Sequence, residues 1–225
     1  MANDATDSPG EAFPPTSVPF EPTPAAAPVA DSGFPRHKVD VVVIGASAGG
    51  VDALLQLLTG LPDGYRLPIV VILHLPETRD SLLADIFRQR LAINVHEAAD
   101  KEGITPGTLY FAGAGYHLSI ENDKSFSLSC EAPVHYSRPS IDLLMESAAD
   151  AYGPRLAGIL LTGANFDGAA GLARISERGG LTVVQDPAEA QVATMPEAAI
   201  ALLQPSLVLP LDGIRRLLLQ LDTLP

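Results

Sequence analysis

The sequence predicts an α/β fold, a doubly wound three-layer sandwich with a mainly parallel sheet and a small antiparallel hairpin insertion. From Lys38 onward, short runs rich in Val, Ile and Leu alternate with longer stretches of helical period. The short runs are apolar at nearly every position, which is typical of parallel strands covered by helices on both faces. Residues 105–130 interrupt this alternation with Gly and Asn-Asp turns, which indicate a hairpin or meander inserted into one domain.

Each predicted element follows from its local pattern. The strands are short and β-branched, which favours extended backbone. In chain order they are VDVVVIG (39–45), LPIVVIL (67–73), the short NVHEA (94–98), LAGILLTG (156–163), LTVVQD (181–186) and SLVLP (206–210). The helices carry apolar residues at helical spacing. They are GGVDALLQLLTGL, SLLADIFRQRL, SIDLLMESAADAYG, GAAGLARISERGG, PEAAIALL and GIRRLLLQL.

The composition divides the chain into a tail, residues 1–37, and a domain, residues 38–225. The tail holds eight of the 20 prolines, and such a segment buries too little apolar surface to offset its ordering entropy, so we expect disorder. The chain is 47% hydrophobic over 225 residues, which is enough for one sizeable core. The start shows no signal-peptide pattern and no apolar run is long enough to span a bilayer, so we expect a cytoplasmic protein.

The charge balance and the cysteine count narrow the possible partners. Lys and Arg number 14 against 27 Asp and Glu, a net charge of −13, which disfavours nucleic acid and anionic membrane surfaces as partners. Cys130 is the only cysteine, which excludes an intramolecular disulfide and a Cys-based metal cluster. We expect no cofactor and no metal.

The turn GASAGG, residues 45–50, joins the first predicted strand to the first predicted helix. It satisfies G-x-S-x-G, which presents a serine nucleophile in this strand–turn–helix context. It nearly satisfies the dinucleotide pattern G-x-G-x-x-G, but Ser47 stands where a glycine must let the backbone approach a pyrophosphate. That pattern also needs an acid at the end of the next strand, where this chain has His74. The turn therefore favours Ser47 as a nucleophile.

A serine nucleophile needs a base within hydrogen-bond reach. His74 ends a predicted strand at the sheet edge where ligands of open α/β sheets collect, so it is the candidate base. Of the other histidines, His37 borders the tail, His96 follows a short strand and His117 lies in the predicted hairpin. His135, in the loop PVHYSRPS, is the second candidate.

The carboxylate that would orient the base is Asp167, in the loop between LAGILLTG and the next helix. On spacing alone, capping of that helix and orientation of a base are equally good interpretations. The common strand order 3-2-1-4-5 favours the second, because neighbouring strands are about 4.8 Å apart and would bring Ser47, His74 and Asp167 together. The order Ser…His…Asp matches none of the three standard hydrolase orders, so an ordinary α/β-hydrolase is not expected.

Five motifs, taken together and in order, resemble the catalytic domain of chemotaxis protein-glutamate methylesterases, the CheB type. They are IGASAGG, ILHLP, SRPSID, LTGANFDGAAGL and ATMPEAA, and the resemblance runs from about Val39 to Leu221. It implies Ser47 as nucleophile, His74 as general base and Asp167 as orienting carboxylate. It also implies a carboxylic ester hydrolase that removes γ-methyl esters from glutamates on the cytoplasmic helical bundle of a chemoreceptor-like protein, and that in many members deamidates glutamines there.

The sequence offers four further candidate site residues. Backbone N–H groups at Ala48 and near Ala164 are candidates to bind the tetrahedral oxyanion. By the resemblance, Arg138 and Met195 match motifs that line the substrate groove, but loop packing and a helix start explain them equally well.

Two features depart from the family pattern. The 37 residues before the domain are too few for the receiver domain of full-length family members, so the resemblance does not extend to control by receiver phosphorylation. Asn165-Phe166 replaces the usual Gly-Asn before Asp167, and a bulky Phe166 there could change substrate choice or oxyanion geometry.

Two alternatives stay open at this point. One is a non-catalytic module of the same fold that docks on receptor helices, against which the three intact residues Ser47, His74 and Asp167 argue. The other, less favoured, is a nucleotide-binding α/β protein.

Overall fold

The computed structural model describes residues 33–34, 36–74 and 83–224. The chain divides into two units, Met1–Ala30 and Asp31–Pro225, and all described residues belong to the second. Most of the expected tail, residues 1–37, lies outside the described residues, so its disorder stays a prediction.

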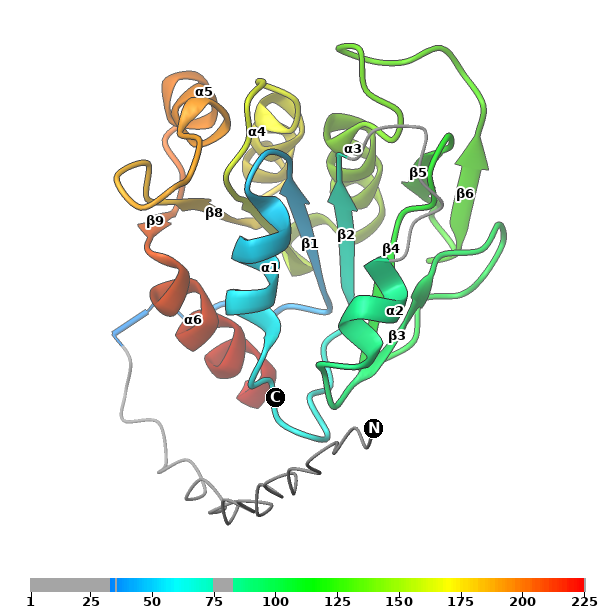
Figure 1. Ribbon diagram of the computed structural model, residues 1–225, viewed down its shortest axis with the longest axis horizontal. Coiled ribbons are helices and arrows are strands. Elements are labelled where there is room, and N and C mark those ends of the chain that lie inside the picture. The colour runs from blue at the N-terminus through cyan, green and yellow to red at the C-terminus, as the bar shows by residue number, and fades with distance from the viewer. Residues whose placement is uncertain (1–32, 35, 75–82, 225) are drawn as a thin grey trace, which may run out of the picture. The chain divides into compact units, whose positions relative to one another are not determined.

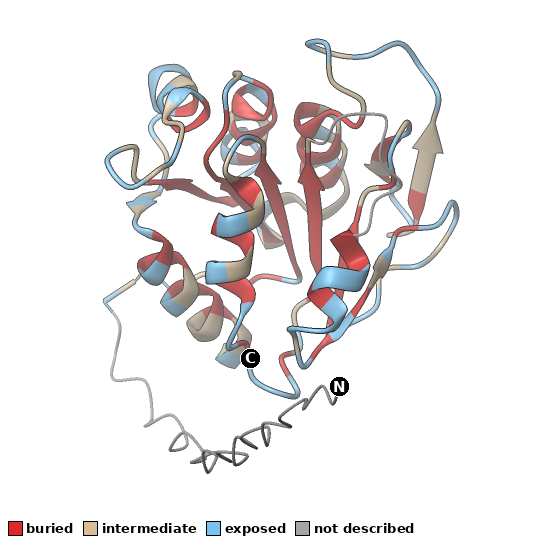
Figure 2. Cartoon of the chain, in the orientation of Figure 1, coloured by how far each residue is buried: buried red, intermediate tan, exposed pale blue. Residues whose placement is uncertain are grey.

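Seven parallel strands form the central sheet of the described domain (Figure 1). Their order across the sheet is β3–β4–β2–β1–β7–β8–β9. Their bounds are β1 Val41–Ala46, β2 Ile69–Leu73, β3 Asn94–Glu97, β4 Thr108–Phe111, β7 Leu156–Leu160, β8 Leu181–Gln185 and β9 Leu207–Leu209. Figure 2 shows the central strands buried along their length, as expected for strands covered on both faces.

Helices cover the two faces of the sheet, and alternate residues of β1 show how. Val42 and Ile44 pack into one core cluster with α1 (Gly50–Leu58) and α6 (Leu211–Thr223), to which α2 (Leu83–Arg88) also contributes. Val41 and Val43 pack into a second cluster with the helices of the other face. These are α3 (Ile141–Tyr152), α4 (Ala169–Glu177) and α5 (Thr194–Leu202), with a short 3-10 turn η1 (Gly153–Arg155) after α3. The predicted doubly wound, three-layer α/β fold is confirmed.

The predicted insertion at residues 105–130 is wrong in its first part. Thr108–Phe111 forms β4, which pairs in parallel with both β2 and β3 and so separates two strands expected to be neighbours. All four residues of β4 are buried, because its side chains enter the cores on both faces of the sheet, which the turn-rich flanking sequence concealed. The rest of the segment forms the antiparallel hairpin that was predicted, β5 (His117–Ile120) paired with β6 (Phe126–Ser129).

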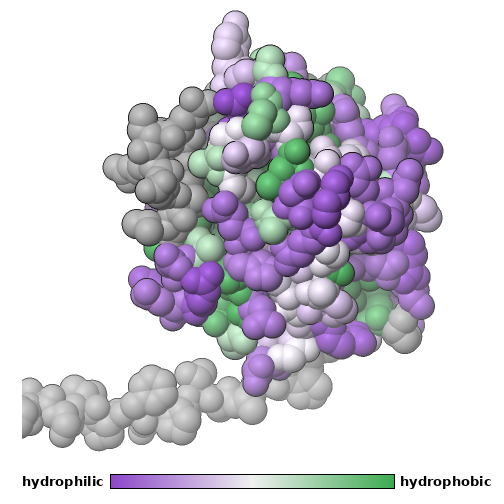
Figure 3. Space-filling model, turned by 90° about the vertical axis from the view of Figure 1, so that its right-hand side faces the viewer, coloured by the Kyte–Doolittle hydropathy of each residue, from purple (hydrophilic) through white to green (hydrophobic). Residues whose placement is uncertain are grey.

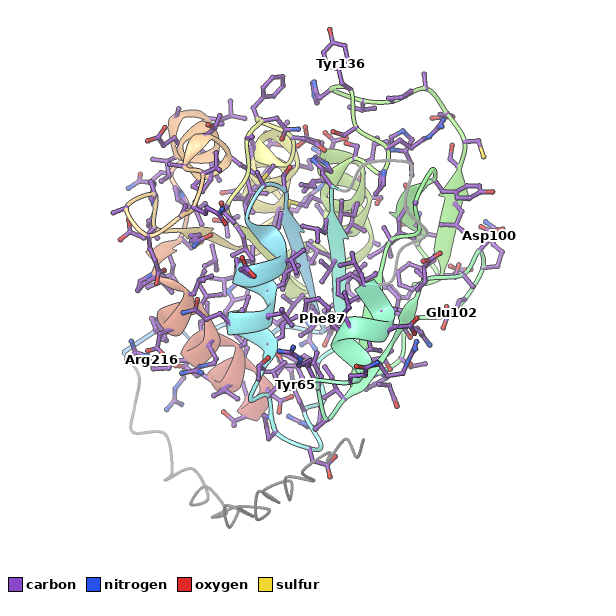
Figure 4. The ribbon with its side chains drawn as sticks, viewed as in Figure 1. Tyr65, Phe87, Asp100, Glu102, Tyr136 and Arg216 are labelled. Carbon is purple, nitrogen blue, oxygen red and sulfur yellow. The ribbon has the colours of Figure 1, made fainter. Side chains whose placement is uncertain are left out.

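The surface beside the hairpin is mixed in character. Figure 3, the view from that side, shows hydrophilic side chains over most of the face and hydrophobic ones in small separate areas. Tyr136, in the loop between β6 and α3, is fully exposed and points away from the body of the domain (Figure 4). Among the described helices, none combines the length and the apolar character needed to cross a bilayer.

Candidate active site

Ser47 lies on the tight turn between β1 and α1. Its N–H donates to the carbonyl oxygen of Thr162 at 2.9 Å, which ties the turn to the end of the neighbouring strand β7. Gly49 has a φ of 79°, a conformation that favours glycine. A Cβ on Gly50 would lie 2.4 Å from a methyl carbon of Leu73, so only glycine lets α1 start this close to β2. The sequence thus holds Ser47 at the carboxyl edge of the sheet.

The structure brings Ser47 and His74 into one cleft. The cleft measures about 210 Å³ and is lined by Ser47, Gly49, Gly50, Val51, Asp52, Leu73, His74 and Gln191. The N–H of His74 donates to the carbonyl oxygen of Ala46 at 3.1 Å, directly before the turn. No hydrogen bond within the described residues joins the Ser47 hydroxyl to the imidazole, so the serine and the ring share the cleft without a direct bond in this state.

Asp167 meets the other side of the imidazole. Its Oδ2 lies 2.9 Å from Nε2 of His74, and its side chain is fully buried. Because a carboxylate only accepts, Nε2 carries the hydrogen and Nδ1 is left as the ring's acceptor. The expected convergence on His74 is therefore seen: Asp167 binds it and Ser47 lies in the same cleft.

The Asp167 carboxylate is also held by the start of α3. Oδ1 accepts from the Ser140 hydroxyl at 2.9 Å and the Asp142 N–H at 3.0 Å, and Oδ2 accepts from the Ile141 N–H at 2.8 Å. With His74, these donors use the roughly four acceptor positions of a carboxylate. The positive end of a 12-residue helix faces the same charge. Asp167 is therefore fixed in position independently of any substrate.

Asp167 does not cap α4, the helix that follows it in the sequence. The residue at the start of α4 is Gly168, with no side-chain cap from its own sequence neighbours. Instead Asp142, from the first turn of α3, accepts from the N–H groups of Gly168 at 2.9 Å and Gly171 at 2.7 Å. The two helices exchange caps: Asp142 serves α4 and Asp167 serves α3. The interpretation of Asp167 as a cap of the following helix is wrong.

The two aspartates have opposite pKa shifts. Burial raises the pKa of Asp167, but the hydrogen bonds from His74, Asp142 and Ile141 outweigh it and hold that pKa below its ordinary value. Burial also raises the pKa of Asp142, to about 6, and the neighbouring Asp167 charge adds to this effect, while the N–H groups of Gly171 and Gly168 oppose it. Asp167 is thus the one of the two carboxylates that stays ionised, in direct contact with His74.

The two oxyanion candidates are accessible to solvent. Ala48 and Ala164 are both exposed, and within the described residues neither backbone N–H donates a hydrogen bond. The Thr162 hydroxyl donates to the carbonyl oxygen of Ala48 at 2.8 Å and so holds that residue in place. Their role as oxyanion donors stays a prediction.

The two groove candidates lie in supporting positions. Met195 is buried, and a Cβ on Gly163 would lie 2.6 Å from its terminal methyl group, so its side chain packs under the loop that carries Asp167. The Arg138 guanidinium donates to the carbonyl oxygens of Cys130 and Glu131 at 3.2 and 3.1 Å, within its own loop. Neither lines the Ser47 cleft, and their contact with a substrate stays a prediction.

The remaining histidines have other partners. His135, the second candidate base, lies 3.5 Å from Asp142 and packs its ring edge-on against Phe166, at 4.6 Å between centroids. His117 is buried, with Nε2 donating to Ala132 and Nδ1 accepting from the N–H of Ser140. His37 donates to the carbonyl oxygen of Pro154, and His96 lies against Glu102. Across residues 33–34, 36–74 and 83–224, no group of three or more His, Cys, Asp or Glu side chains is placed to hold a metal ion.

Sequence reasoning missed three residues of the site, and it missed the contacts of a fourth, Asn165. Ser140 and Asp142 both donate hydrogen bonds to the Asp167 carboxylate. Gln191 packs against Gly49 in the cleft. Asn165 lies between Asp167 and His74. Ser140 and Asp142 follow a proline in an N-cap pattern, which predicts a helix start but not the neighbour that the start binds. Gln191 carried no signal.

Comparison with known proteins identifies relatives of this domain. The family model described as CheB methylesterase matches residues 42–218. A Leptospira interrogans protein, provisionally named protein-glutamate methylesterase/protein-glutamine glutaminase, is 45% identical over 183 residues, covering 81% of this chain and 95% of the relative. The protein-glutamate methylesterase FrzG of Myxococcus xanthus is 36% identical, over 90% of this chain and 60% of the relative.

A solved structure extends the similarity to three dimensions. The crystal structure of the Thermotoga maritima CheB methylesterase catalytic domain superposes with a TM-score of 0.77 at 31% identity, covering 82% of this chain and 99% of that domain. A Carboxydothermus hydrogenoformans protein-glutamate methylesterase/protein-glutamine glutaminase is 41% identical over 77% of this chain, but the match spans only 53% of the relative. The chain therefore covers nearly all of some relatives and little more than half of others.

Proposed function

The chain belongs to the CheB methylesterase family, and from that premise we propose that it is a serine hydrolase that demethylates glutamate γ-methyl esters on a chemoreceptor-like protein. The observation that carries the proposal is the cleft shared by Ser47 and His74, backed by the 2.9 Å contact between His74 and the buried Asp167. We propose the cytoplasmic part of the receptor as the place of action.

The mechanism follows from the orientation of the imidazole. Ser47 Oγ attacks the ester carbonyl carbon while Nδ1 of His74 takes its proton. The resulting imidazolium donates through Nε2 to Asp167, whose fixed negative charge stabilises it. The same proton then passes to the departing methoxide, which leaves as methanol. Water, deprotonated by the neutral imidazole, attacks the acyl-enzyme carbonyl, and the imidazolium then passes that proton to the departing Ser47 Oγ, which releases the glutamate product and free Ser47.

The tetrahedral intermediate carries a negative oxygen that needs preorganised donors. The N–H groups of Ala48 and Ala164 are the proposed pair. Two facts support them: both residues are exposed, and neither N–H has a partner within the described part of the chain.

Hydrolysis of a glutamine side chain follows the same route. The acyl-enzyme forms from the amide carbonyl, and ammonia leaves in place of methanol after taking its proton from His74. The names of the Leptospira and Carboxydothermus relatives join the two activities, which supports a glutaminase activity of this chain as well.

Methanol release from a methylated chemoreceptor fragment tests the proposal. Ser47→Ala should lower the rate by roughly 10⁴-fold or more, because the remaining groups cannot form the acyl-enzyme. Ser127→Ala, on β6 of the hairpin, is the matched control and should leave the rate unchanged. Methanol release that survives in Ser47→Ala would refute the serine mechanism. A wild type that binds the fragment but releases no methanol would instead favour the non-catalytic docking module.

A further inference from the structure

The Asn165 side chain lies between Asp167 and His74, where it contacts both. Its Oδ1 accepts from the Asp167 N–H at 3.2 Å, and its Nδ2 lies 3.5 Å from Nδ1 of His74. We propose that Asn165 is a positioning residue for the base: its amide donates to Nδ1 and keeps the resting imidazole neutral, with its unprotonated nitrogen on the side of the serine. The inference rests on the proposed function, in which Nδ1 takes the serine proton.

The orientation of the Asn165 amide is fixed by its other contact. A backbone N–H can only donate, so the atom facing the Asp167 N–H must be the amide oxygen. The NH₂ group then faces Nδ1, and because that group only donates, Nδ1 must be unprotonated. The Asp167 carboxylate independently requires the hydrogen on Nε2. Two contacts from different groups therefore select the same tautomer of His74.

The charges around the ring explain why such a donor matters. Of the carboxylates in the described residues, Asp167 contacts His74 directly and Asp52 lines the same cleft. A negative charge near an imidazole favours the protonated form, which cannot act as a base. A hydrogen bond to Nδ1 is possible only in the neutral form, so Asn165 opposes the effect of these two acids.

The contact between the Asn165 amide and Nδ1 of His74 is weak, as expected for a group that the serine hydroxyl must displace during the reaction. At 3.5 Å the hydrogen bond is long and weak, and the Asn165 side chain is only partly buried. When a substrate brings the Ser47 hydroxyl to Nδ1, the amide can give up this position at little cost. Once Nδ1 has taken the proton it no longer accepts, so the amide is not drawn back until the imidazole is neutral again.

Titration of His74 by NMR tests the inference without any substrate. In protein labelled with ¹⁵N-histidine, the His74 signals are assigned by comparison with His74→Gln. Asn165→Ser keeps an oxygen acceptor for the Asp167 N–H but removes the donor, and the pH at which the ring becomes protonated should rise by roughly 0.3–0.7 unit. Asn165→Asp keeps the turn and adds a charge, so it should raise that pH by about one unit or more.

Several outcomes would overturn the inference. One is Asn165→Ser titrating at the same pH as the wild type, or lower; another is a wild-type ring that carries its hydrogen on Nδ1. A purely structural role for Asn165 would lower the melting temperature of both variants and leave the titration in place. Because the titration needs no turnover, it stays readable if the wild type releases no methanol, so a failure of the proposed function and a failure of this inference are distinguishable.

Discussion

Two regions of the site, the serine end around Ser47 and the aspartate end around Asp167, differ in their hydrogen bonding. Within the described residues, the backbone donor next to Ser47 has no hydrogen-bond partner, whereas the acceptor positions of the Asp167 carboxylate are filled. The N–H of Ala48 has no partner in the described part of the chain, and α1 starts without a side-chain cap. Asp167, by contrast, receives four hydrogen bonds in a fully buried position. In the proposed mechanism, in which the Ala48 N–H binds the oxyanion, the difference reflects the lifetime of the two charges. An oxyanion exists only during turnover, so its donors must wait unpaired, while a permanent buried carboxylate needs its donors at all times.

The largest expected effect comes from breaking the aspartate end with Asp167→Asn. An amide offers one acceptor oxygen and presents its NH₂ to donors, so it cannot satisfy the same partners, and His74 loses its fixed tautomer. We expect methanol release to fall by roughly 10³–10⁴-fold and the free energy of unfolding to fall by roughly 2–4 kcal/mol. Steady-state kinetics and urea unfolding measure the two effects.

Asp150→Asn is the matched control for that change. Asp150 lies on α3, the helix whose first turn binds Asp167, but it is exposed and pairs with Arg174 and Arg178. Exposed ion pairs contribute little, so activity and stability should both stay close to the wild type. An Asp167→Asn protein as active and as stable as this control would contradict the contrast between the two ends.

A second pair of changes compares one glycine at each end. Gly49 and Gly168 both have positive φ, at 79° and 97°. A Cβ on Gly49 would meet the exposed side chain of Gln191, which can move, whereas a Cβ on Gly168 would lie 2.6 Å from the packed side chains of Ile141 and Leu160. We expect Gly168→Ala to destabilise the protein by roughly 1–3 kcal/mol more than Gly49→Ala.

Gly64→Ala gives the baseline for that comparison. Gly64 has a φ of 87° and nothing within 4 Å of an added Cβ, so its substitution measures the backbone strain alone. Thermal or urea unfolding of the three variants ranks them. If Gly168→Ala costs no more than Gly64→Ala, the contact between α3 and α4 is not as tight as the structure indicates.

A smaller effect is expected when one of the Asp167 donors is removed. Ser140→Ala deletes the hydroxyl that donates to Oδ1 at 2.9 Å and leaves the three other donors in place. Stability should fall by about 1–2 kcal/mol, and activity by less than in Asp167→Asn. Unfolding and methanol release in parallel provide the measurement; a loss of activity equal to that of Asp167→Asn would mean that the hydroxyl has a role beyond holding the carboxylate.

The smallest expected effect is a change in the pH dependence of stability when Asp142, the carboxylate that caps α4, is replaced. The pKa of Asp142 is raised by burial from 3.8 to about 6, so between these pH values the folded protein keeps a proton that the unfolded chain has released. Wild-type stability therefore gains from this group below about pH 4 and loses that gain as pH rises through 6. Asp142→Asn keeps an acceptor for Gly168 and Gly171 but does not titrate.

The variant should accordingly gain stability relative to the wild type, by on the order of 1 kcal/mol, as the pH is raised from 4 to 7. Urea unfolding at a series of pH values gives this difference. A difference that is constant across the range would show that Asp142 does not titrate in this window.

The features that sequence patterns predicted are those set by a strand and its carboxyl end. The apolar runs before Ser47 and His74 predicted both the strands and the edge where the two residues meet, and the alternation of strands with helices predicted the three layers. The strand β4 was missed because four residues between turns are too short to distinguish a buried parallel strand from part of a hairpin.

The other features depend on which helix ends face each other. Asp167 precedes α4 in sequence, so a cap of that helix was a reasonable alternative, but the packing of α3 against α4 gives each helix the aspartate of the other. Such an exchange joins residues some 25 positions apart, and no local pattern encodes it. Asn165 was noticed only as a departure from a motif, and its contact with His74 depends on the path of the loop.

Labelling with a sulfonyl fluoride tests the central claim most directly, because it reports the reactivity of Ser47 without a substrate. Mass spectrometry of digested protein should find the adduct on Ser47 in the wild type, with labelling at least about 100-fold slower in Asp167→Asn and His74→Gln. Labelling of Ser47 at the same rate in all three proteins, or a wild-type Ser47 that stays unmodified, would contradict the claim that His74, held by Asp167, activates this serine.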